Sequence, residues 1–149
     1  MKKILIILPA FFIFTSCRSD ENGNQQIEAS LIGKWSFQKV DAVKSATNQT
    51  QTIEKSDCDK KSIHEFLGTV HKSTFYGIVG SSCQLTGEVS SRNYTFDKAN
   101  MKFWYENEQD YPYFITKLTE NELVFEDRSQ DVDNDGKTDI IRRYFSKIH

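Results

Sequence analysis

The densest group of metal-ligating residues in the chain lies between residues 131 and 139, which read Asp-Val-Asp-Asn-Asp-Gly-Lys-Thr-Asp. Aspartates at the first, third, fifth and ninth positions, with glycine at the sixth, form a pattern typical of calcium-binding loops. Calcium is a hard cation that takes about six to eight oxygen ligands. The predicted ligands are the carboxylates of Asp131, Asp133, Asp135 and Asp139 and the main-chain carbonyl of Lys137.

The twelfth position of this loop is Arg142, where an EF-hand carries a bidentate glutamate. Any calcium binding is therefore expected to be weak, in the range of about 10⁻⁴–10⁻³ M. The alternative is a solvated acidic hairpin turn, because Asp135-Gly136 is a strong turn signal between two extended runs. The clustered carboxylates repel one another unless water or a cation neutralises them, so both interpretations remain open.

The amino terminus has the features of an export signal. Two lysines precede an apolar run over residues 4–14 that is too short to span a bilayer of about 30 Å. Small residues then lead into Cys17, and this junction resembles the lipobox of bacterial lipoproteins. The resemblance implies that residues 1–16 are a cleaved signal peptide and that Cys17 receives a diacylglycerol anchor. The alternative is an ordinary secretory signal in which Cys17 is incidental.

Residues 17–30 are expected to form a lipidated, flexible tether, because they are polar and have little to bury. The stretch Arg18-Ser19-Asp20-Glu21 resembles the short serine-plus-acidic export signal of some Bacteroidetes lipoproteins. That resemblance implies transfer to the cell surface, and a solvated acidic linker is the alternative. We therefore expect a lipid-anchored protein of the outer membrane that faces the periplasm or the cell surface.

Cys58 and Cys83 are the two cysteines left beyond Cys17, and in an exported protein they are expected to form a disulfide. Two reduced, buried thiols are the alternative. A nucleophile built from Cys58 and His64 lacks the third group that would orient the histidine. His64 and His71 would face opposite sides of a single strand, although Gly68 between them predicts a turn. The sequence also lacks nucleophile-elbow and phosphate-loop motifs, so we expect no enzymatic activity.

The charge of the chain argues against a nucleic-acid partner. Lysine and arginine number 19 against 21 acidic residues, which gives a net charge of −2. Removal of residues 1–16 takes away two lysines and makes the balance more acidic. Nucleic-acid binding requires clustered basic side chains, and no such cluster is present in the sequence.

The remainder of the chain reads as one all-β domain. Aromatic residues are abundant, proline is scarce, and short alternating runs are separated by turn residues. About eight or nine strands favour an up-and-down antiparallel β-barrel, with a sandwich as the alternative. Residues 44–57 are predicted to form a long polar loop. The predicted strands cover 31–40, 63–67, 70–78, 83–89, 94–97, 101–105, 113–118, 123–126 and 139–147.

Gly33-Lys34-Trp35 on the first predicted strand resembles the Gly-x-Trp signature of lipocalins. Together with 58–61, Cys83, 118–123 and 143–147, it makes residues 31–149 similar to bacterial lipocalin-like lipoproteins. The resemblance implies that Gly33 permits a close approach where the chain enters the barrel. It also implies that Trp35 plugs the closed end beneath an arginine of the last strand, either Arg142 or Arg143.

A barrel of this kind is expected to bind a small apolar ligand without catalysis. The alternating aromatic residues predicted to line its cavity are Phe75, Tyr94, Phe96, Phe103, Tyr105 and Tyr113. The alternative is a filled core, in which case the protein would serve as an interaction or structural lipoprotein of the envelope. That alternative predicts a protein or glycan partner at an exposed aromatic patch near Trp104 and Tyr111.

Overall fold

The computed structural model describes residues 29–149. The regular secondary structure of this part of the chain is β-strand, apart from the short 3-10 turn η1 (Asp59–Lys61). The strands are β1 (Gly33–Val43), β2 (Thr50–Glu54), β3 (Ile63–Leu67), β4 (Val70–Thr74), β5 (Tyr76–Val79), β6 (Ser82–Leu85), β7 (Ser90–Asp97), β8 (Lys102–Tyr105), β9 (Tyr113–Leu118), β10 (Glu122–Asp127) and β11 (Ile140–Ile148).

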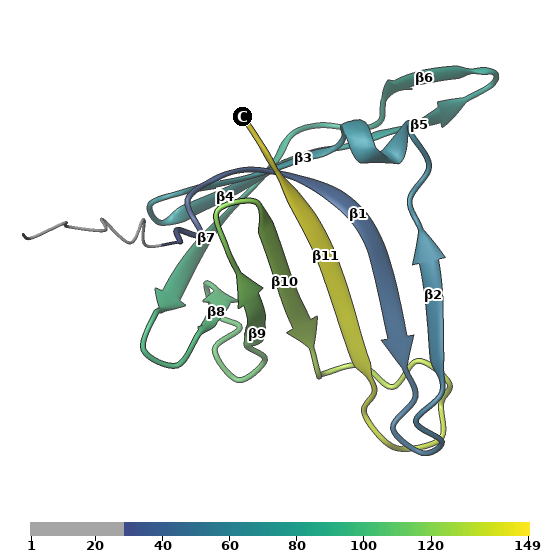
Figure 1. Cartoon of the computed structure of the whole chain (residues 1–149), viewed down its shortest axis with the longest axis vertical. Helices are drawn as coiled ribbons and strands as arrows, with labels where there is room; N and C mark the ends of the chain where they lie inside the picture. Colours follow the sequence, from purple (N-terminus) through teal and green to yellow (C-terminus); the bar gives the residue numbers. More distant parts are fainter. Residues whose placement is uncertain (1–28) are drawn as a thin grey trace, which may run out of the picture.

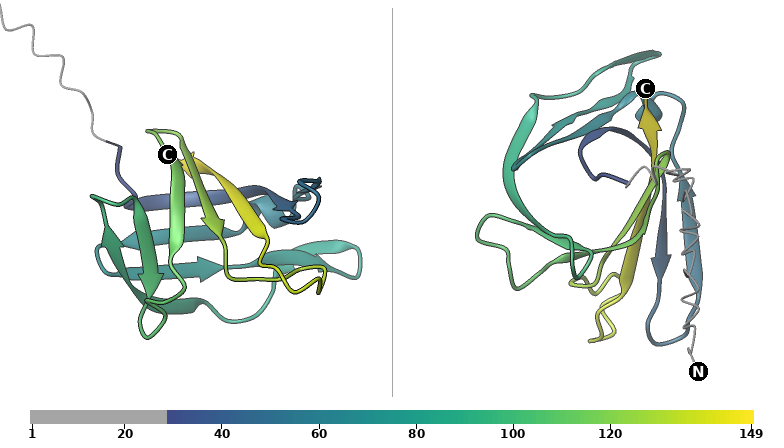
Figure 2. Two further views of the ribbon diagram at one scale, coloured as in Figure 1. Left: turned by 90° about the horizontal axis from the view of Figure 1, so that it is seen from below. Right: turned by 60° about the vertical axis from the view of Figure 1, so that its left-hand side comes forward.

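Eight of these strands close into an antiparallel barrel. The hydrogen-bonded order is β1-β3-β4-β7-β8-β9-β10-β11, and β11 pairs back onto β1. Consecutive barrel strands are neighbours throughout, so the chain follows an up-and-down path around the interior (Figure 2). The predicted all-β, up-and-down barrel is thereby confirmed. Closure leaves no unpaired edge in the barrel wall, which removes a site for unwanted strand pairing.

Two elements stand outside the barrel wall. β2 pairs with the second half of β1, from Lys39 to Val43, whereas β3 pairs with the first half, from Gly33 to Ser36. β5 and β6 form a separate hairpin, which projects at the upper right of Figure 1. The expectation of a polar loop over 44–57 was wrong for Thr50–Glu54, because the half of β1 that β3 leaves free offers its backbone groups to this exposed strand.

The two ends of the barrel differ. At one end lie Gly33 and the short turns after β3, β7 and β9; we call this the closed end. At the other, open end lie the longer connections 75–89, 106–112 and 128–139. In Figure 1 the open-end parts of β1, β2 and β11 project together at the bottom. Long loops at one end leave room for an opening there, whereas tight turns allow side chains to seal the other end.

Side chains fill the closed end. Five of the largest side chains in the interior are fully buried there: Leu31, Trp35, Phe66, Phe103 and Leu123. The indole nitrogen of Trp35 donates a hydrogen bond to the carbonyl of Leu31 at 2.9 Å. Gly33 has a φ of +136°, a conformation that side-chain-bearing residues rarely adopt, and the side chain of Lys147 occupies the space beside it.

The cation above Trp35 is the ammonium of Lys147. The expectation that Arg142 or Arg143 lies there was wrong. The Lys147 ammonium lies 4.2 Å from the centre of the indole and donates to the carbonyl of Ile32 at 2.7 Å. The register of β1 and β11 explains the error, since Trp35 is opposite Lys147 whereas Arg142 and Arg143 are opposite Asp41 and Val40, toward the open end. The β1 bulge between Phe37 and Lys39 contributes to this offset.

The predicted disulfide between Cys58 and Cys83 is confirmed, with a Cα–Cα distance of 5.5 Å. It joins the residue before η1 to strand β6. The bridge therefore ties the projecting β5–β6 hairpin to the segment that connects β2 with β3.

Candidate ligand-binding cavity

A cavity of about 320 Å³ lies inside the barrel, between the filled closed end and the open end. Its wall combines aromatic rings with histidines, serines and arginines. The lining residues are Phe37, His64, Phe66, His71, Ser73, Phe75, Ser90, Arg92, Tyr105, Tyr113, Phe125, Arg143 and Phe145. Among these residues there is no carboxylate.

Three of the six aromatic residues predicted to line a cavity do so: Phe75, Tyr105 and Tyr113. Tyr94 and Phe103 lie instead in the packed core, where both rings meet Phe66 edge to face. Phe96 packs against that core and borders a separate, smaller pocket near residues 29–32. These three residues lie toward the closed end, so the filled core and the cavity expected as alternatives occupy different halves of one barrel.

A chain of hydrogen bonds runs along one wall of the cavity. The hydroxyl of Tyr105 lies 2.7 Å from Nδ1 of His71. The hydroxyl of Ser73 lies 3.3 Å from Nε2 of His71 and 3.1 Å from Nδ1 of His64. His64 and His71 stack with ring centres 5.5 Å apart, because the turn at Gly68 folds β3 and β4 against each other and brings both rings to the inner face.

Burial keeps both histidines neutral at physiological pH. Burial, and then the nearby Arg143 cation, lower the pKa of His64 to about 4. Burial, followed by electrostatic interaction with His64 and with Arg92, lowers the pKa of His71 to about 3. Burial also raises the pKa of Tyr105 and of Tyr113. The wall therefore presents neutral donors and acceptors beside two permanent arginine cations.

The two arginines are bound differently. Arg92 forms an ion pair with Glu108, and its guanidinium lies over the ring of Tyr105, 3.7 Å from the ring centre. Nη1 of Arg143 lies 3.5 Å from a carboxylate oxygen of Asp127 but makes no hydrogen bond, and it is buried. Nε2 of His64 is likewise buried without a hydrogen-bond partner. Arg142, on the outer side of β11, donates instead to Glu126 at 2.7 and 2.9 Å.

Sequence reasoning missed the polar part of this site. His64, His71 and Arg92 were not predicted to line the cavity, and Arg143 was one of the two arginines expected above Trp35. Strand alternation contained the signal, since Arg92 is two residues from Tyr94, Arg143 two from Phe145, and His64 two from Phe66. Positions two apart on a strand share a face, so these basic side chains point into the barrel with the rings.

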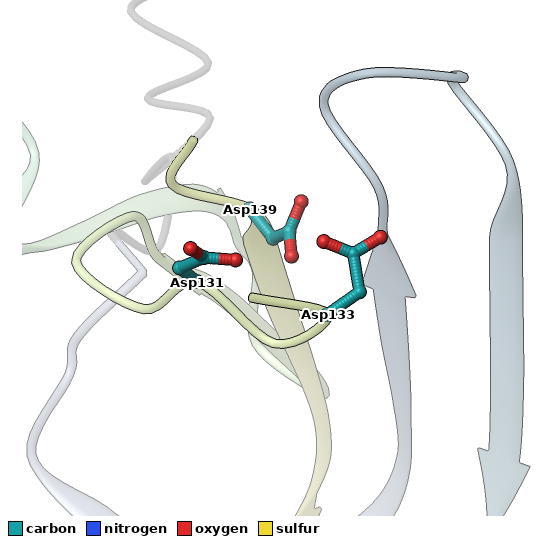
Figure 3. A group of neighbouring side chains, drawn as sticks. All are labelled: Asp131, Asp133 and Asp139. Atoms are coloured by element: carbon teal, nitrogen blue, oxygen red, sulfur yellow. The ribbon is translucent and has the colours of Figure 1, made fainter. Parts of the chain in front are cut away.

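The acidic loop brings three of its five predicted ligands together. Ligand oxygens of Asp131, Asp133 and Asp139 lie within 4.8 Å of one another, and their carboxylates converge in Figure 3. Asp133 also lies 3.3 Å from the ammonium of Lys44, a cation that would compete with a metal ion. Asp135 and Lys137 are not part of the group, and the Asp135 carboxylate instead accepts a hydrogen bond from the amide of Lys137.

The same carboxylates organise the loop itself. Asp131 accepts hydrogen bonds from the amides of Asp135 and Gly136, which holds the tight turn. Asp139 accepts from the amides of Ser45 at 2.8 Å and Val132 at 2.9 Å, and these bonds lower the pKa of its carboxyl. The hairpin-turn interpretation therefore accounts for part of the motif, and calcium binding at Asp131, Asp133 and Asp139 stays a prediction.

Other predicted features lie outside the cavity or outside the described residues. Cys58 is not available as a nucleophile because it is in the disulfide. The aromatic patch was predicted near Trp104 and Tyr111. Tyr111 is exposed, and Trp104 is half-buried. The predicted signal peptide (1–16), the predicted lipidation site Cys17 and the tether up to residue 28 lie outside the described residues. Within residues 29–149 there is no helix of sufficient length and apolar character to cross a bilayer.

Comparison with known families agrees with this architecture. The sequence pattern of the lipocalin-like domain matches residues 31–125, from the segment before β1 into β10. That span is well over half of the chain, and the protein belongs to the lipocalin-like domain family. β11, which closes the barrel and contributes Arg143 and Phe145 to the cavity, lies beyond the matched span. No curated protein matches the chain.

Proposed function

We propose that this protein is a lipid-anchored binding protein that holds a small, largely apolar molecule inside its barrel and catalyses no reaction. The observation that supports the proposal most directly is the cavity of about 320 Å³ at the open end of a barrel whose other end is filled. Ligand pockets in proteins measure about 300–1,000 Å³, so this volume suits a small ligand. A lipocalin-like fold is consistent with that role.

The cavity wall favours an apolar body with a few polar contacts. Phe145 stacks between Phe37 and Phe125. Its ring centre lies 5.0 Å from that of Phe37 and 5.1 Å from that of Phe125. Such a wall removes apolar ligand surface from water, which contributes about 25 cal/mol per Å² of buried area. The few convergent polar groups would orient the ligand rather than supply most of its affinity.

The proposed location follows from the amino-terminal sequence. Lipidation of Cys17 would anchor the domain to the outer membrane, facing the periplasm or the cell surface. The chain enters the barrel at the closed end, beside Trp35. The opening of the cavity is therefore at the end of the barrel opposite the point where the tether joins.

The proposal is tested by displacement of an environment-sensitive dye such as Nile red from the complete mature chain carrying Cys17→Ser, which permits purification without detergent. We expect saturable binding that small amphiphiles displace. Ser90→Trp, which places an indole in the cavity wall, should weaken binding at least tenfold. Ser91→Trp is the matched control, because Ser91 is the next residue on β7, faces the other side and does not line the cavity. Equal binding by the two variants would contradict the proposal.

A further inference from the structure

Two nitrogen atoms in the cavity wall are buried without a hydrogen-bond partner: Nε2 of His64 and Nη1 of Arg143. Buried polar groups in folded proteins are almost always hydrogen-bonded, and each exception requires an explanation. Both residues line the same cavity, and the ring of Phe145, two residues from Arg143 on β11, has its centre 5.2 Å from that of the His64 imidazole. Together His64 and Arg143 form a small polar region with unused hydrogen-bonding capacity beside the aromatic rings of the wall.

The permanently charged side chains that line the cavity are all positive. The chain as a whole has more acidic than basic residues, yet its cavity is lined by two arginines and by no carboxylate. Arg92 is already paired with Glu108. The nearest carboxylate to Arg143 is that of Asp127, at 3.5 Å and without hydrogen-bond geometry, and it also accepts bonds from Ser129 and Gln130. A cleft lined by one sign of charge attracts ligands of the opposite sign.

A neutral histidine can donate a hydrogen bond to such a ligand. When the hydroxyl of Tyr105 donates to Nδ1 of His71, Nε2 of His71 donates to Ser73 and Ser73 donates to Nδ1 of His64. This order leaves the proton of His64 on Nε2, the atom that has no partner. The reverse order leaves a lone pair there instead. An anion that accepts from Nε2 selects the first order, without any change in the charge of the protein.

We propose that the ligand is an amphiphilic carboxylic acid, bound as its anion, whose head group accepts hydrogen bonds from Nη1 of Arg143 and Nε2 of His64. This inference rests on the proposed function, and it names the class of ligand. A carboxylate has two oxygen atoms and can accept from both donors at once. The alkyl part lies along the stacked rings of Phe37, Phe125 and Phe145, which adjoin Arg143 in the wall.

The experiment compares two ligands that differ in the head group, decanoate and decanol, in the dye-displacement assay at pH 7.5 with the mature chain carrying Cys17→Ser. Decanoate should bind at least tenfold more tightly than decanol, because a hydrogen bond between charged partners contributes at least about that factor. Equal affinities, or preference for decanol, would overturn the inference while leaving the proposed function intact. Failure of both ligands and of the dye to bind would overturn both.

Arg143→Gln separates recognition of the head group from a general effect on the barrel. Its affinity for decanoate should fall at least tenfold while its affinity for decanol stays within about twofold of the parent. The matched control is Arg142→Gln, at the adjacent residue, which contacts Glu126 on the outer side of the barrel and should leave the ratio of the two affinities unchanged. Equal losses for decanoate and decanol in Arg143→Gln would contradict the inference.

His64→Phe provides a second, independent variant that keeps an aromatic ring at this position. It should weaken decanoate binding by about threefold to tenfold and leave decanol binding unchanged or improved, because one donor to the carboxylate is lost while the wall becomes more apolar. An unchanged preference for decanoate in both His64→Phe and Arg143→Gln would show that the head group binds elsewhere.

Discussion

At the scale of single residues, the closed end depends on Trp35, which is fully buried and has its indole nitrogen bonded to Leu31. Replacement of such a side chain by alanine leaves a cavity that the surrounding strands cannot fill. We expect Trp35→Ala to lower the free energy of unfolding by about 3–5 kcal/mol, measured by urea denaturation.

Trp104→Ala is the matched control for this prediction, because Trp104 is only half-buried and lies on the outer face of β8. Its cost should be less than half that of Trp35→Ala. If Trp104→Ala lowers the free energy of unfolding as much as Trp35→Ala does, burial of the indole at the closed end does not account for the effect.

The two cavity histidines predict a loss of stability in mild acid. Their pKa values in the folded protein, about 4 and about 3, lie below the ordinary value of 6.5, so the unfolded chain binds more protons between these limits. Their contribution to stability is complete above pH 6.5 and declines as the pH falls toward 4. Between pH 7.5 and 5 we expect the free energy of unfolding to fall by up to about 2 kcal/mol per histidine.

Urea denaturation at a series of pH values measures this decline. The double variant His64→Phe, His71→Phe should show a much flatter profile between pH 7.5 and 5, and His149→Gln, at an exposed position, serves as the control. The paired carboxylates Glu126 and Asp127, whose pKa values are lowered, lose their contribution only at more acidic pH. A profile as steep in the double variant as in the parent would contradict the assignment to the histidines.

At the scale of elements, the disulfide joins two segments that have few other attachments, since the β5–β6 hairpin pairs only within itself. The bridge spans 25 residues, and closing a loop of that length in the unfolded chain stabilises the fold by about 3 kcal/mol. We expect the double variant Cys58→Ser, Cys83→Ser to unfold at correspondingly lower urea concentration. A reducing agent should destabilise the parent protein by a similar amount and leave the double variant unchanged.

The acidic loop leads to a separate prediction about calcium. Three converging carboxylates favour the ion, whereas the ion pair with Lys44 and the absence of a glutamate at position twelve of the loop oppose it. We expect calorimetric titration to show a dissociation constant of about 10⁻⁴–10⁻³ M. Asp133→Ala should abolish the signal, and Asp110→Ala, outside the loop, should retain it. Titration heats that equal those of dilution in the parent protein would leave the hairpin turn as the sole role of the motif.

At the scale of the whole molecule, the barrel is filled at one end and hollow at the other, and the chain enters it from residue 29 at the filled end. The anchor itself is a prediction from residues 1–17. In the native host, the parent protein should fractionate with membranes, and Cys17→Ser should release it into the soluble fraction, because the diacylglycerol and any further acyl chain hold it to the bilayer. A Cys17→Ser protein that remains in the membrane fraction would contradict lipidation at this residue.

Local patterns in the sequence predicted the fold. Period-two alternation, turn residues and the Gly-x-Trp signature indicated an up-and-down barrel, because side chains must alternate between interior and solvent along each strand. The sequence also predicted the pairing of Cys58 with Cys83 from the small number of cysteines. β2 was missed, since Thr50–Glu54 is exposed and has no alternation to reveal a strand.

What the sequence alone determined is thus which residues face inward and where the chain turns, because both follow from contacts between near neighbours in the chain. Only the tertiary structure decided which inward residues lie at the same height in the barrel. The register of β11 against β1 places Lys147 over Trp35 and leaves Arg143 beside the cavity that His64 also lines. That register depends on hydrogen bonds between strands about a hundred residues apart in the chain and on a bulge, neither of which a local pattern contains.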